Sequence, residues 1–522
     1  HAAGGGAAGC VLAGRLSADP RRRVLLIEAG GAALSPLYRI PLGIGRLRAA
    51  RSGLWRIATE PEPHLDGRVM EMATGRVLGG SAAINGMIHM RPPDADLDRW
   101  AARGNDGWDA ATLGPVFARL ADDLAPRRGG AAHPLDRAFL DACTRAGLPR
   151  RDDLGAWPAP CAGPVEFNIH DGRRFSAPQA YLDPARDRPN LEVLTGAPAL
   201  ALESVAGRVR GVVVARRGRR ETLRATGEVV VAAGALQSPL LLLRSGIGPA
   251  AELARFGIAV VADLPGVGGN LQNHVDIALR IACPAPVTLH SLLRAERILP
   301  AMAQAWLFGT GPATRFPGEA AAFLRSDPGE ALPDLLCHLV QGLGIRGIRW
   351  PLRRAARDRL DREGFSCRIM LLRPESRGRV TLRSADPRDP PRLRFDYLSH
   401  PREMARLVAG VRRMREIFAD KAFDGWRAEE IEPGEQCRDD DALAAWIRAR
   451  ADMQCHPVGT CAMGTGPDAV VDPALRVIGV DGLRVADASV MPDIVGVNTF
   501  ATTVAIAERA ATLMGAPSSA PA

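Results

Sequence analysis

The sequence predicts an α/β fold (α+β overall), in which one parallel sheet is assembled from segments far apart in the chain. A glycine-rich turn at 4–9 precedes a small apolar stretch and a strand-like run at 24–27. Similar apolar runs return at 228–234 and 483–487. Between about 280 and 450 the pattern changes to mixed strands and long Arg/Ala helices, which indicates a second domain inserted into the first.

The first glycines fit a dinucleotide-binding turn. Gly4, Gly6 and Gly9 have the spacing G-x-G-x-x-G, which lets a backbone approach a pyrophosphate closely. Glu28 follows the strand-like run, at the distance from the glycines where an acid contacts the adenosine ribose.

The strand that should precede these glycines is missing from the pattern. Only His1, Ala2 and Ala3 stand there, and we do not expect them to form a strand. A sheet without its central first strand would lose the support under the turn. We therefore expect a truncated start and weakened cofactor binding.

Two later segments have clear local patterns. Residues 211–215, with 190–195 before them, predict a β-meander. Residues 403–420 predict a long helix in the second domain.

Composition excludes several classes of protein. The 522 residues carry a net charge of +9, but the arginines are spread along the chain and Lys421 is the only lysine. The basic cluster at 216–220 has no interleaved aromatic residues, so nucleic-acid binding is not predicted. Nine cysteines without C-x-x-C spacing predict reduced thiols, a cytoplasmic protein and no metal site. No apolar run has the length of a membrane span.

Residues 75–87 combine a basic residue, paired glycines, a hydroxyl and an amide. These are Arg76, Gly79, Gly80, Ser81 and Asn85. Such a segment offers close backbone approach and hydrogen-bond donors to an anionic or polar ring system. A tight turn before a helix is the structural alternative.

Two polar residues near the C-terminus are candidates for catalysis. His456 precedes a proline and a Gly-containing turn, so an irregular loop would hold its imidazole where it can reach a ligand. Asn498 or Thr499 is a natural N-cap for the last helix, whose positive end could face a cofactor.

Together these segments resemble the glucose–methanol–choline (GMC) family of flavin-dependent oxidoreductases, in its choline dehydrogenase and alcohol dehydrogenase branch. The matching stretches occur in family order and cover nearly the whole chain. They are GGGAAGCVLAGRL with VLLIEAGG, GRVLGGSAAINGMIHMR, GALQSPLLLLRSGIGP with DLPGVGGNLQNH, RPESRGRVTLRSADP, and HPVGTCAMG with LRVADASVMP and NTFATTVAIAERAA.

The resemblance implies FAD and a fold with two interleaved domains. A Rossmann-like FAD-binding domain would comprise 1–130, 190–280 and 450–522, and a substrate domain built on an antiparallel sheet would comprise 131–189 and 281–449. Carried onto this chain, the FAD-binding residues are Gly4, Gly6, Gly9, Glu28, Arg76, Gly79, Gly80, Ser81, Asn85, Gly86, Ala233, Gly234, Asp487, Ala488, Asn498 and Thr499.

The implied reaction is oxidation of a primary alcohol, with hydride transfer to flavin N5. His456 matches the family's catalytic histidine, and Asn498 matches its His-or-Asn partner. A quinone or another carrier would receive the electrons. An oxygen-using oxidase, a cyanohydrin lyase and an FAD-poor inactive homologue are the alternatives.

Departures from the family pattern concern the flavin and the substrate. Ile84 stands where some relatives attach FAD covalently, which predicts non-covalent FAD. Cys455 and Phe500 replace common neighbours of the catalytic pair and would reshape the pocket. Glu319 lies near the position of an acid that binds quaternary ammonium groups in choline-oxidising relatives; alternatively it pairs with an arginine. No aromatic box accompanies it. A small-molecule alcohol is the expected partner, in the cytoplasm or peripherally at the inner membrane.

Overall fold

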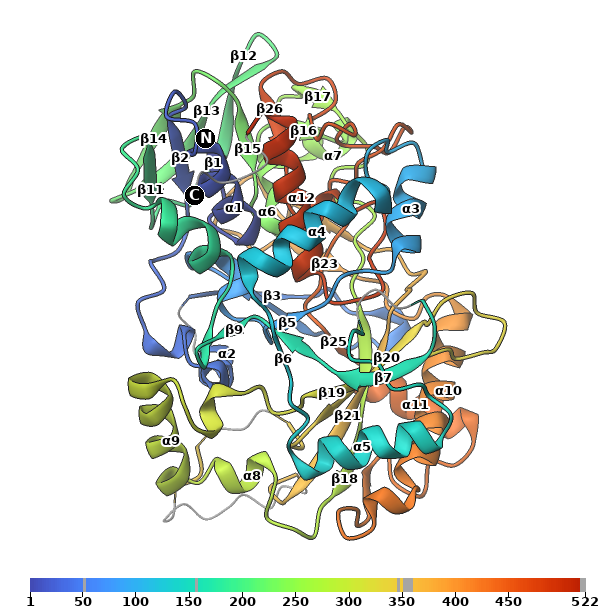
Figure 1. Ribbon diagram of the computed structural model, residues 1–522. Coiled ribbons are helices and arrows are strands. Elements are labelled where there is room, and N and C mark those ends of the chain that lie inside the picture. Colours follow the sequence, from blue (N-terminus) through green and yellow to red (C-terminus); the bar gives the residue numbers. More distant parts are fainter. Residues whose placement is uncertain (50–52, 155–157, 345–347, 351–359, 517–522) are drawn as a thin grey trace.

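The computed structural model describes residues 1–49, 53–154, 158–344, 348–350 and 360–516. A parallel sheet occupies the upper part of the molecule in Figure 1, and an antiparallel sheet occupies the lower part. The last predicted segment of the FAD-binding domain thus ends, at 517–522, outside the described residues.

The parallel sheet has five strands in the order β11-β2-β1-β15-β26. The strands are β1 (Ala2–Ala3), β2 (Val24–Ile27), β11 (Leu191–Leu194), β15 (Val229–Val231) and β26 (Leu483–Val485). Helices α1 (Ala7–Leu16), α6 (Gly234–Arg244) and α12 (Phe500–Leu513) lie beside them (Figure 1). Short apolar runs with few polar residues form these strands because the sheet is buried.

The expectation that no strand precedes the first glycines is wrong. Ala2 pairs with Leu26 on one side and Val230 on the other, and Ala3 pairs with the next residue of each strand. Both alanines are buried. Two neighbouring strands and burial offset the low strand propensity of alanine, so a two-residue strand supports the glycine turn.

The predicted β-meander is confirmed only in part. Residues 211–215 lie in β13 (Arg208–Arg216), between β12 (Ala199–Val205) and β14 (Arg219–Arg224). Residues 190–195 do not join this sheet, because β11 pairs in parallel with β2. The apolar pattern of β11 is the same in either sheet, and only tertiary pairing decides between them.

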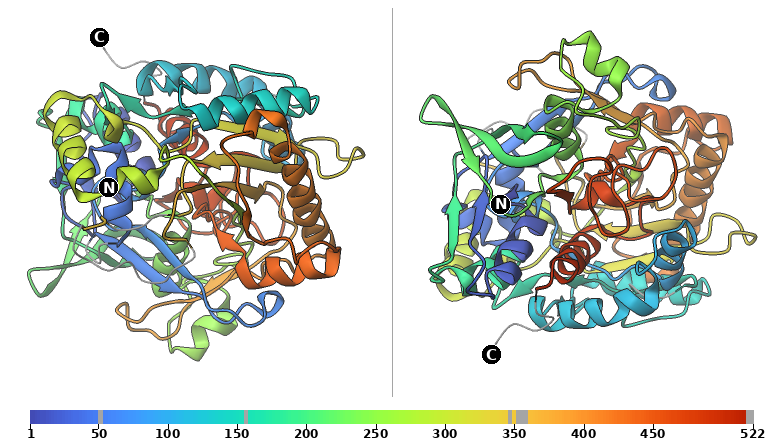
Figure 2. Two further views of the ribbon diagram at one scale, coloured as in Figure 1. Left: turned by 90° about the horizontal axis from the view of Figure 1, so that it is seen from below. Right: turned by 90° about the horizontal axis from the view of Figure 1, so that it is seen from above.

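The antiparallel sheet has seven strands, in the order β24-β18-β21-β20-β19-β7, with β25 also paired to β18. They are β7 (Cys161–Pro164), β18 (Val275–Ala282), β19 (Ala320–Leu324), β20 (Leu335–Val340), β21 (Gly364–Leu371), β24 (Glu430–Glu432) and β25 (Asp452–Met453). Helices α5 (Pro134–Arg145), α10 (Pro401–Phe418) and α11 (Asp440–Arg450) lie around it (Figures 1 and 2). The helix predicted at 403–420 is α10. The domain boundaries stay a prediction, and β18 crosses residue 280.

The structure has further helices and strands outside these sheets. The remaining helices are α2 (Ile44–Ala49), α3 (Asp94–Ala102), α4 (Ala110–Leu124), α7 (Ala250–Arg255), α8 (Leu289–Leu292) and α9 (Ala295–Phe308). The remaining strands are β3 (Leu54–Ala58), β4 (Glu71–Gly75), β5 (Ile88–His89), β6 (Arg127–Arg128), β8 (Glu166–Phe167), β9 (Ile169–His170), β10 (Arg173–Arg174), β16 (Ile247–Gly248), β17 (Ala262–Asp263), β22 (Arg379–Thr381) and β23 (Arg392–Arg394). Within the described ranges, no helix has the length and apolar character to cross a bilayer. All nine cysteines are free.

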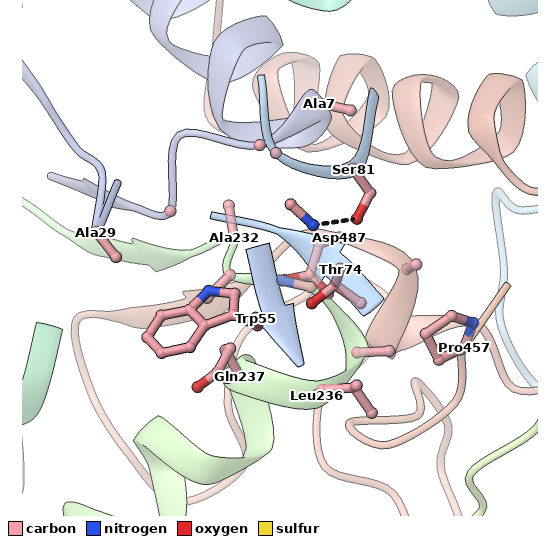
Figure 3. A pocket seen from close by; sticks show the side chains of 18 of the residues that line it. Ala7, Ala29, Trp55, Thr74, Ser81, Ala232, Leu236, Gln237, Pro457 and Asp487 are labelled. Atoms are coloured by element: carbon pink, nitrogen blue, oxygen red, sulfur yellow. Dashed lines mark hydrogen bonds between the residues drawn. The ribbon is translucent and has the colours of Figure 1, made fainter. Parts of the chain in front are cut away.

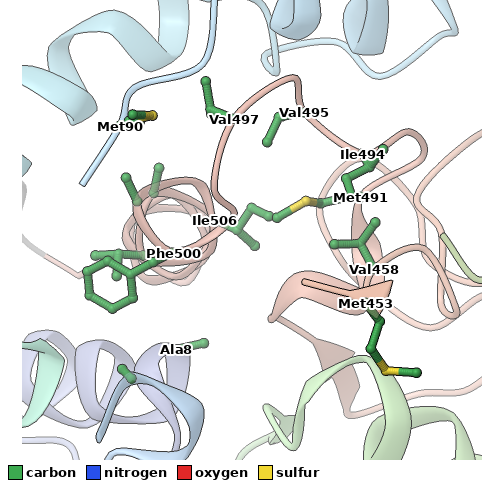
Figure 4. Close-up of a cluster of buried hydrophobic side chains, with 14 of the residues drawn as sticks. Ala8, Met90, Met453, Val458, Met491, Ile494, Val495, Val497, Phe500 and Ile506 are labelled. Carbon is green, nitrogen blue, oxygen red and sulfur yellow. The ribbon is translucent and has the colours of Figure 1, made fainter. Parts of the chain in front are cut away.

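A buried cluster fixes the C-terminal helix against the loops that carry the candidate catalytic pair. Figure 4 shows Ile506 of α12 pointing toward Met491, with Val458 and Val497 on the loops around it and Phe500 on the other side of the helix. Val458 is two residues from His456, and Val497 is next to Asn498. Packing on both sides therefore limits the movement of the two polar side chains.

A buried ionic contact also joins α12 to α1. Arg15 Nε lies 2.9 Å from a carboxylate oxygen of Glu508, and the same guanidinium pairs with Asp123 of α4. The Arg15 and Glu508 side chains are nearly buried, so the contact fixes the glycine turn relative to the C-terminal helix.

Candidate active site

A long cavity of about 430 Å³ runs from the glycine turn to His456 and Asn498. Its walls come from the ends of the parallel strands, from β3 and β4, and from the start of α12 (Figure 3). The predicted residues that line it are Gly4, Gly6, Glu28, Gly80, Ser81, Asn85, Gly86, Ala233, Gly234, Cys455, His456, Asp487, Ala488, Asn498, Thr499 and Phe500. Gly9, Arg76, Gly79 and Glu319 are not among its lining residues.

The glycine turn leaves space for a ligand at one of its three positions. A Cβ on Gly4, whose φ is +122°, would lie 2.4 Å from the carbonyl oxygen of Ala232, and a Cβ on Gly9 would lie 1.8 Å from that of Gly4. Gly6 lines the cavity, and a Cβ on it would meet no atom nearer than 3.9 Å. Gly4 and Gly9 thus permit the turn, and Gly6 permits a close ligand at the start of α1.

The second glycine pair packs on the first. Gly79 N donates to the carbonyl oxygen of Gly5 at 2.7 Å, and a Cβ on Gly80 would lie 2.8 Å from Cα of Gly6. Gly79 and Gly80 both have positive φ, which glycine adopts without strain. Ser81 Oγ accepts from Gly75 N at 3.2 Å (Figure 3).

Arg174 stabilises the turn that contains Gly79 and Gly80 through hydrogen bonds, a role that the sequence did not indicate. Its guanidinium donates to the carbonyl oxygens of Ala82 and Asn85 and to Asn85 Oδ1. Burial lowers the pKa of Arg174 to about 9. Arg76 is the basic residue that the sequence predicted for this site. Its guanidinium carbon lies 4.4 Å from the centroid of the Trp55 ring, and Trp55 lines the cavity.

Two buried acids line the cavity at the ends of parallel strands. Glu28 accepts from Gly5 N at 2.9 Å and from Gly30 N at 2.7 Å, and burial raises its pKa. Asp487 accepts from Gly234 N at 2.8 Å and from the Ser238 hydroxyl at 2.6 Å. Each carboxylate keeps lone pairs for further donors such as ribose hydroxyls.

A chain of hydrogen bonds fixes the tautomer of His456. His274 Nε2 lies 3.1 Å from the carbonyl oxygen of Leu372 and must donate to it. His274 Nδ1 therefore accepts, from His456 Nδ1 at 3.0 Å. His456 Nε2 is then unprotonated, and it lies 3.2 Å from Nδ2 of Asn498.

The surroundings of this pair keep both imidazoles neutral. Burial lowers the pKa of His456 well below its usual value, and the neighbouring His274 and the Arg48 guanidinium lower it further. Burial also lowers the pKa of His274 to about 4. The arrangement supplies a neutral base whose lone pair lies beside an amide donor.

Two residues of this network were not assigned a role from the sequence. His274 sets the tautomer, and Asn273 Oδ1 accepts from the backbone N–H of His456 at 2.7 Å. Both lie in the stretch LQNH, some 180 residues before His456. Membership of that stretch was the only feature of the sequence that could have pointed to them, because their contacts with His456 form only on folding.

The GMC oxidoreductase models match residues 2–276 with their N-terminal part and residues 374–507 with their C-terminal part. The chain belongs to the GMC oxidoreductase family. The α/β fold class and the resemblance seen in the sequence are thereby confirmed.

Several known proteins are similar to this chain over more than nine-tenths of their length. An oxygen-dependent choline dehydrogenase of Brucella ovis is 40% identical, over 97% of this chain and 93% of the relative. One of Sinorhizobium fredii is 40% identical, over 97% and 94%. The structure of pyridoxine 4-oxidase from Mesorbium loti is 31% identical with a TM-score of 0.85, covering 98% of both chains. A fungal aryl-alcohol oxidase, 24% identical with a TM-score of 0.80 over 98% of both chains, shares the fold.

As a GMC oxidoreductase the protein is an FAD-dependent enzyme, and its cavity fits that cofactor. The open side of Gly6 suits a pyrophosphate, and the carboxylate of Glu28 suits a ribose. At the other end, the buried Oδ1 of Asn498 has no hydrogen-bond partner among the described residues. Ile84 offers no nucleophile for attachment, so non-covalent binding stays the prediction.

The surroundings of three further predicted residues, Glu319, Thr499 and Cys455, are as follows. Glu319 is not at the His456 site: it lies in a second cavity, where it pairs with Arg127 at 3.1 Å and accepts from Gly130 N at 3.0 Å. The predicted arginine pair is thus what the structure contains. Thr499 occupies the N-cap of α12, but its side chain makes no capping hydrogen bond. Cys455 lines the cavity with its Sγ 3.3 Å from Arg48 Nη2.

Proposed function

We propose that this GMC oxidoreductase oxidises a primary alcohol to the aldehyde, with His456 as the base. The observation that supports it is the unprotonated Nε2 of His456 beside the Asn498 amide at the end of the cofactor cavity. FAD, when bound, supplies the acceptor for the hydride that leaves the α-carbon of the alcohol.

Different residues bind the cofactor and transfer the proton. Gly4, Gly6 and Gly9 would hold the pyrophosphate of FAD, and Glu28 its ribose. His456 Nε2 accepts the hydroxyl proton of the alcohol. Asn498 Nδ2 donates a hydrogen bond to the substrate oxygen and stabilises it as it loses that proton.

The neutral His456 gives the reaction a characteristic pH dependence. Only the unprotonated imidazole is a base, so activity falls as pH drops through its pKa. Because that pKa is lowered well below 6.5, we expect kcat/KM to stay level through pH 6.5 and to fall only at lower pH. A steady-state pH profile with a soluble dye as acceptor measures this. An acid limb centred at pH 6.5 or above would contradict the assignment.

We propose that the alcohol is uncharged rather than a quaternary ammonium compound, although curated relatives are choline dehydrogenases. Arg48 places a positive charge beside Cys455, next to the base. Glu319, the acid considered for a cation, is paired with Arg127 in the other cavity. A cationic substrate would meet repulsion at this end of the cavity.

An acceptor assay separates the proposed dehydrogenase from an oxidase. We expect aliphatic and aromatic primary alcohols to bleach the bound flavin anaerobically, and faster than choline does. Slow return of the colour in air supports a quinone or another carrier as acceptor, whereas rapid return identifies an oxidase. A protein that is bleached by choline alone would contradict the substrate proposal.

A further inference from the structure

Helix α9 (Ala295–Phe308) presents its larger apolar side chains to solvent. Leu299, Trp306, Leu307 and Phe308 are 46%, 43%, 63% and 72% exposed. Figure 1 places α9 at the lower left edge of the molecule, and Figure 2 (left) also shows it at the periphery. Most surface helices of soluble proteins face water with polar residues instead.

The inner side of α9 is formed by the buried residues Ala295, Ile298, Ala301 and Ala305. Ala301 and Ala305 pack with Ile40 and Ala313 in a separate small cluster. The outward side chains are therefore not needed for the core. Trp350, 51% exposed, is a further apolar side chain near the start of the helix, because Arg349 forms a β-bridge with Arg294. Exposed apolar patches of this kind mark interaction sites.

Positive charge borders this surface. Arg297, on the first turn of α9, and Arg315, which follows the helix, are exposed. Neither makes an ion pair with another residue of the described ranges. The Glu296 carboxylate pairs with Arg294 and also interacts with Arg297, so the three arginines Arg294, Arg297 and Arg315 outnumber this one acid and leave the border positively charged.

We propose that the face of α9 formed by Leu299, Trp306, Leu307 and Phe308, with Trp350, docks the protein on an anionic phospholipid bilayer. The apolar side chains would enter the boundary between headgroups and acyl chains, and Arg297 and Arg315 would contact lipid phosphates. Tryptophan suits this boundary because its ring is apolar and its N–H is polar. This docking does not depend on the proposed reaction.

The charge border argues against a second copy of the chain as the occupant of this face. A two-fold contact places the same patch on both partners. It would bring Arg297 and Arg315 of each copy close together, where like charges repel. Lipid phosphates are complementary to the same two residues.

The docking face lies beside the second cavity of about 810 Å³. Arg297 and Arg315 line this cavity, and so does Phe316. Phe316 also lies against Gly86, a residue that lines the cofactor cavity, because a Cβ on Gly86 would lie 3.4 Å from the Phe316 ring. If the proposed function holds, a quinone dissolved in the bilayer would meet the protein at this mouth.

Cosedimentation with vesicles tests the docking. The FAD-loaded protein is mixed with phosphatidylglycerol–phosphatidylcholine vesicles and with phosphatidylcholine vesicles alone. We expect it to sediment with the anionic vesicles, and less at high salt. The double variant Leu307→Glu/Phe308→Glu should bind at least about tenfold more weakly. Val205→Glu, at a site 59% exposed at the end of β12, adds an acid on a distant surface; it is the control and should bind as the wild type.

Two outcomes would overturn the docking proposal. One is failure of the wild type to bind anionic vesicles, or equal binding by the double variant. The other is a solution dimer that the double variant dissociates, which would make the face an interface between copies. Alcohol-dependent reduction of a soluble dye should be the same in all three proteins. Absence of that activity in the wild type would refute the proposed function, but it would not change the conclusion from the vesicle experiment.

Discussion

Replacing His456 with alanine is expected to slow flavin reduction by a primary alcohol at least about a hundredfold, while FAD stays bound. The variant removes the unprotonated Nε2 that lies 3.2 Å from Asn498 Nδ2. It removes no residue of the glycine turns, so cofactor binding should persist. Anaerobic stopped-flow absorbance measures the rate, and the flavin spectrum reports occupancy.

The control for this variant is His64→Ala, because His64 is exposed on the surface. It should reduce flavin at the wild-type rate. Unchanged reduction in His456→Ala would remove His456 from the role of base. Loss of FAD from that variant would instead assign the residue to cofactor binding.

Replacing Gly6 with valine is expected to weaken FAD binding by at least about tenfold without unfolding the protein. A Cβ at this position meets no protein atom nearer than 3.9 Å, and Gly6 has extended backbone angles that valine adopts readily. The added methyl groups would occupy the space proposed for the pyrophosphate. Titration of the apoprotein with FAD, followed by flavin fluorescence, gives the affinity.

Gly227→Val provides the matched substitution, because a Cβ there meets no atom within 4 Å and the residue does not line the cavity. It should bind FAD like the wild type. Equal FAD affinity of Gly6→Val and Gly227→Val would contradict the placement of the pyrophosphate at Gly6. Similar thermal unfolding of the two variants shows that the fold is retained.

Much of the parallel sheet was predictable because its strands are short, buried apolar runs. The exception, β1, is too short for any periodicity, and its two alanines form a strand only because β2 and β15 pair with them. The assignment of residues 190–195 to the meander failed for a related reason: local pattern does not specify the partner strand.

The candidate site, too, could be predicted from the sequence only in part. Glycine spacing and Glu28 predicted one end of the cavity from local sequence, and His456 and Asn498 predicted the other. The role of His274 could not be predicted, because it depends on a contact across 182 positions of the chain. For Glu319 the sequence left two alternatives, a cation site and an arginine pair, and only the folded structure identifies Arg127 as its partner.

The most direct test of the central claim is an anaerobic single turnover of the FAD-loaded protein with a primary alcohol and with its α-deuterated form. We predict complete loss of the oxidised flavin absorbance, formation of a stoichiometric amount of aldehyde, and a several-fold slower reduction with the deuterated alcohol. A protein that holds FAD but is reduced by no primary alcohol would contradict the account.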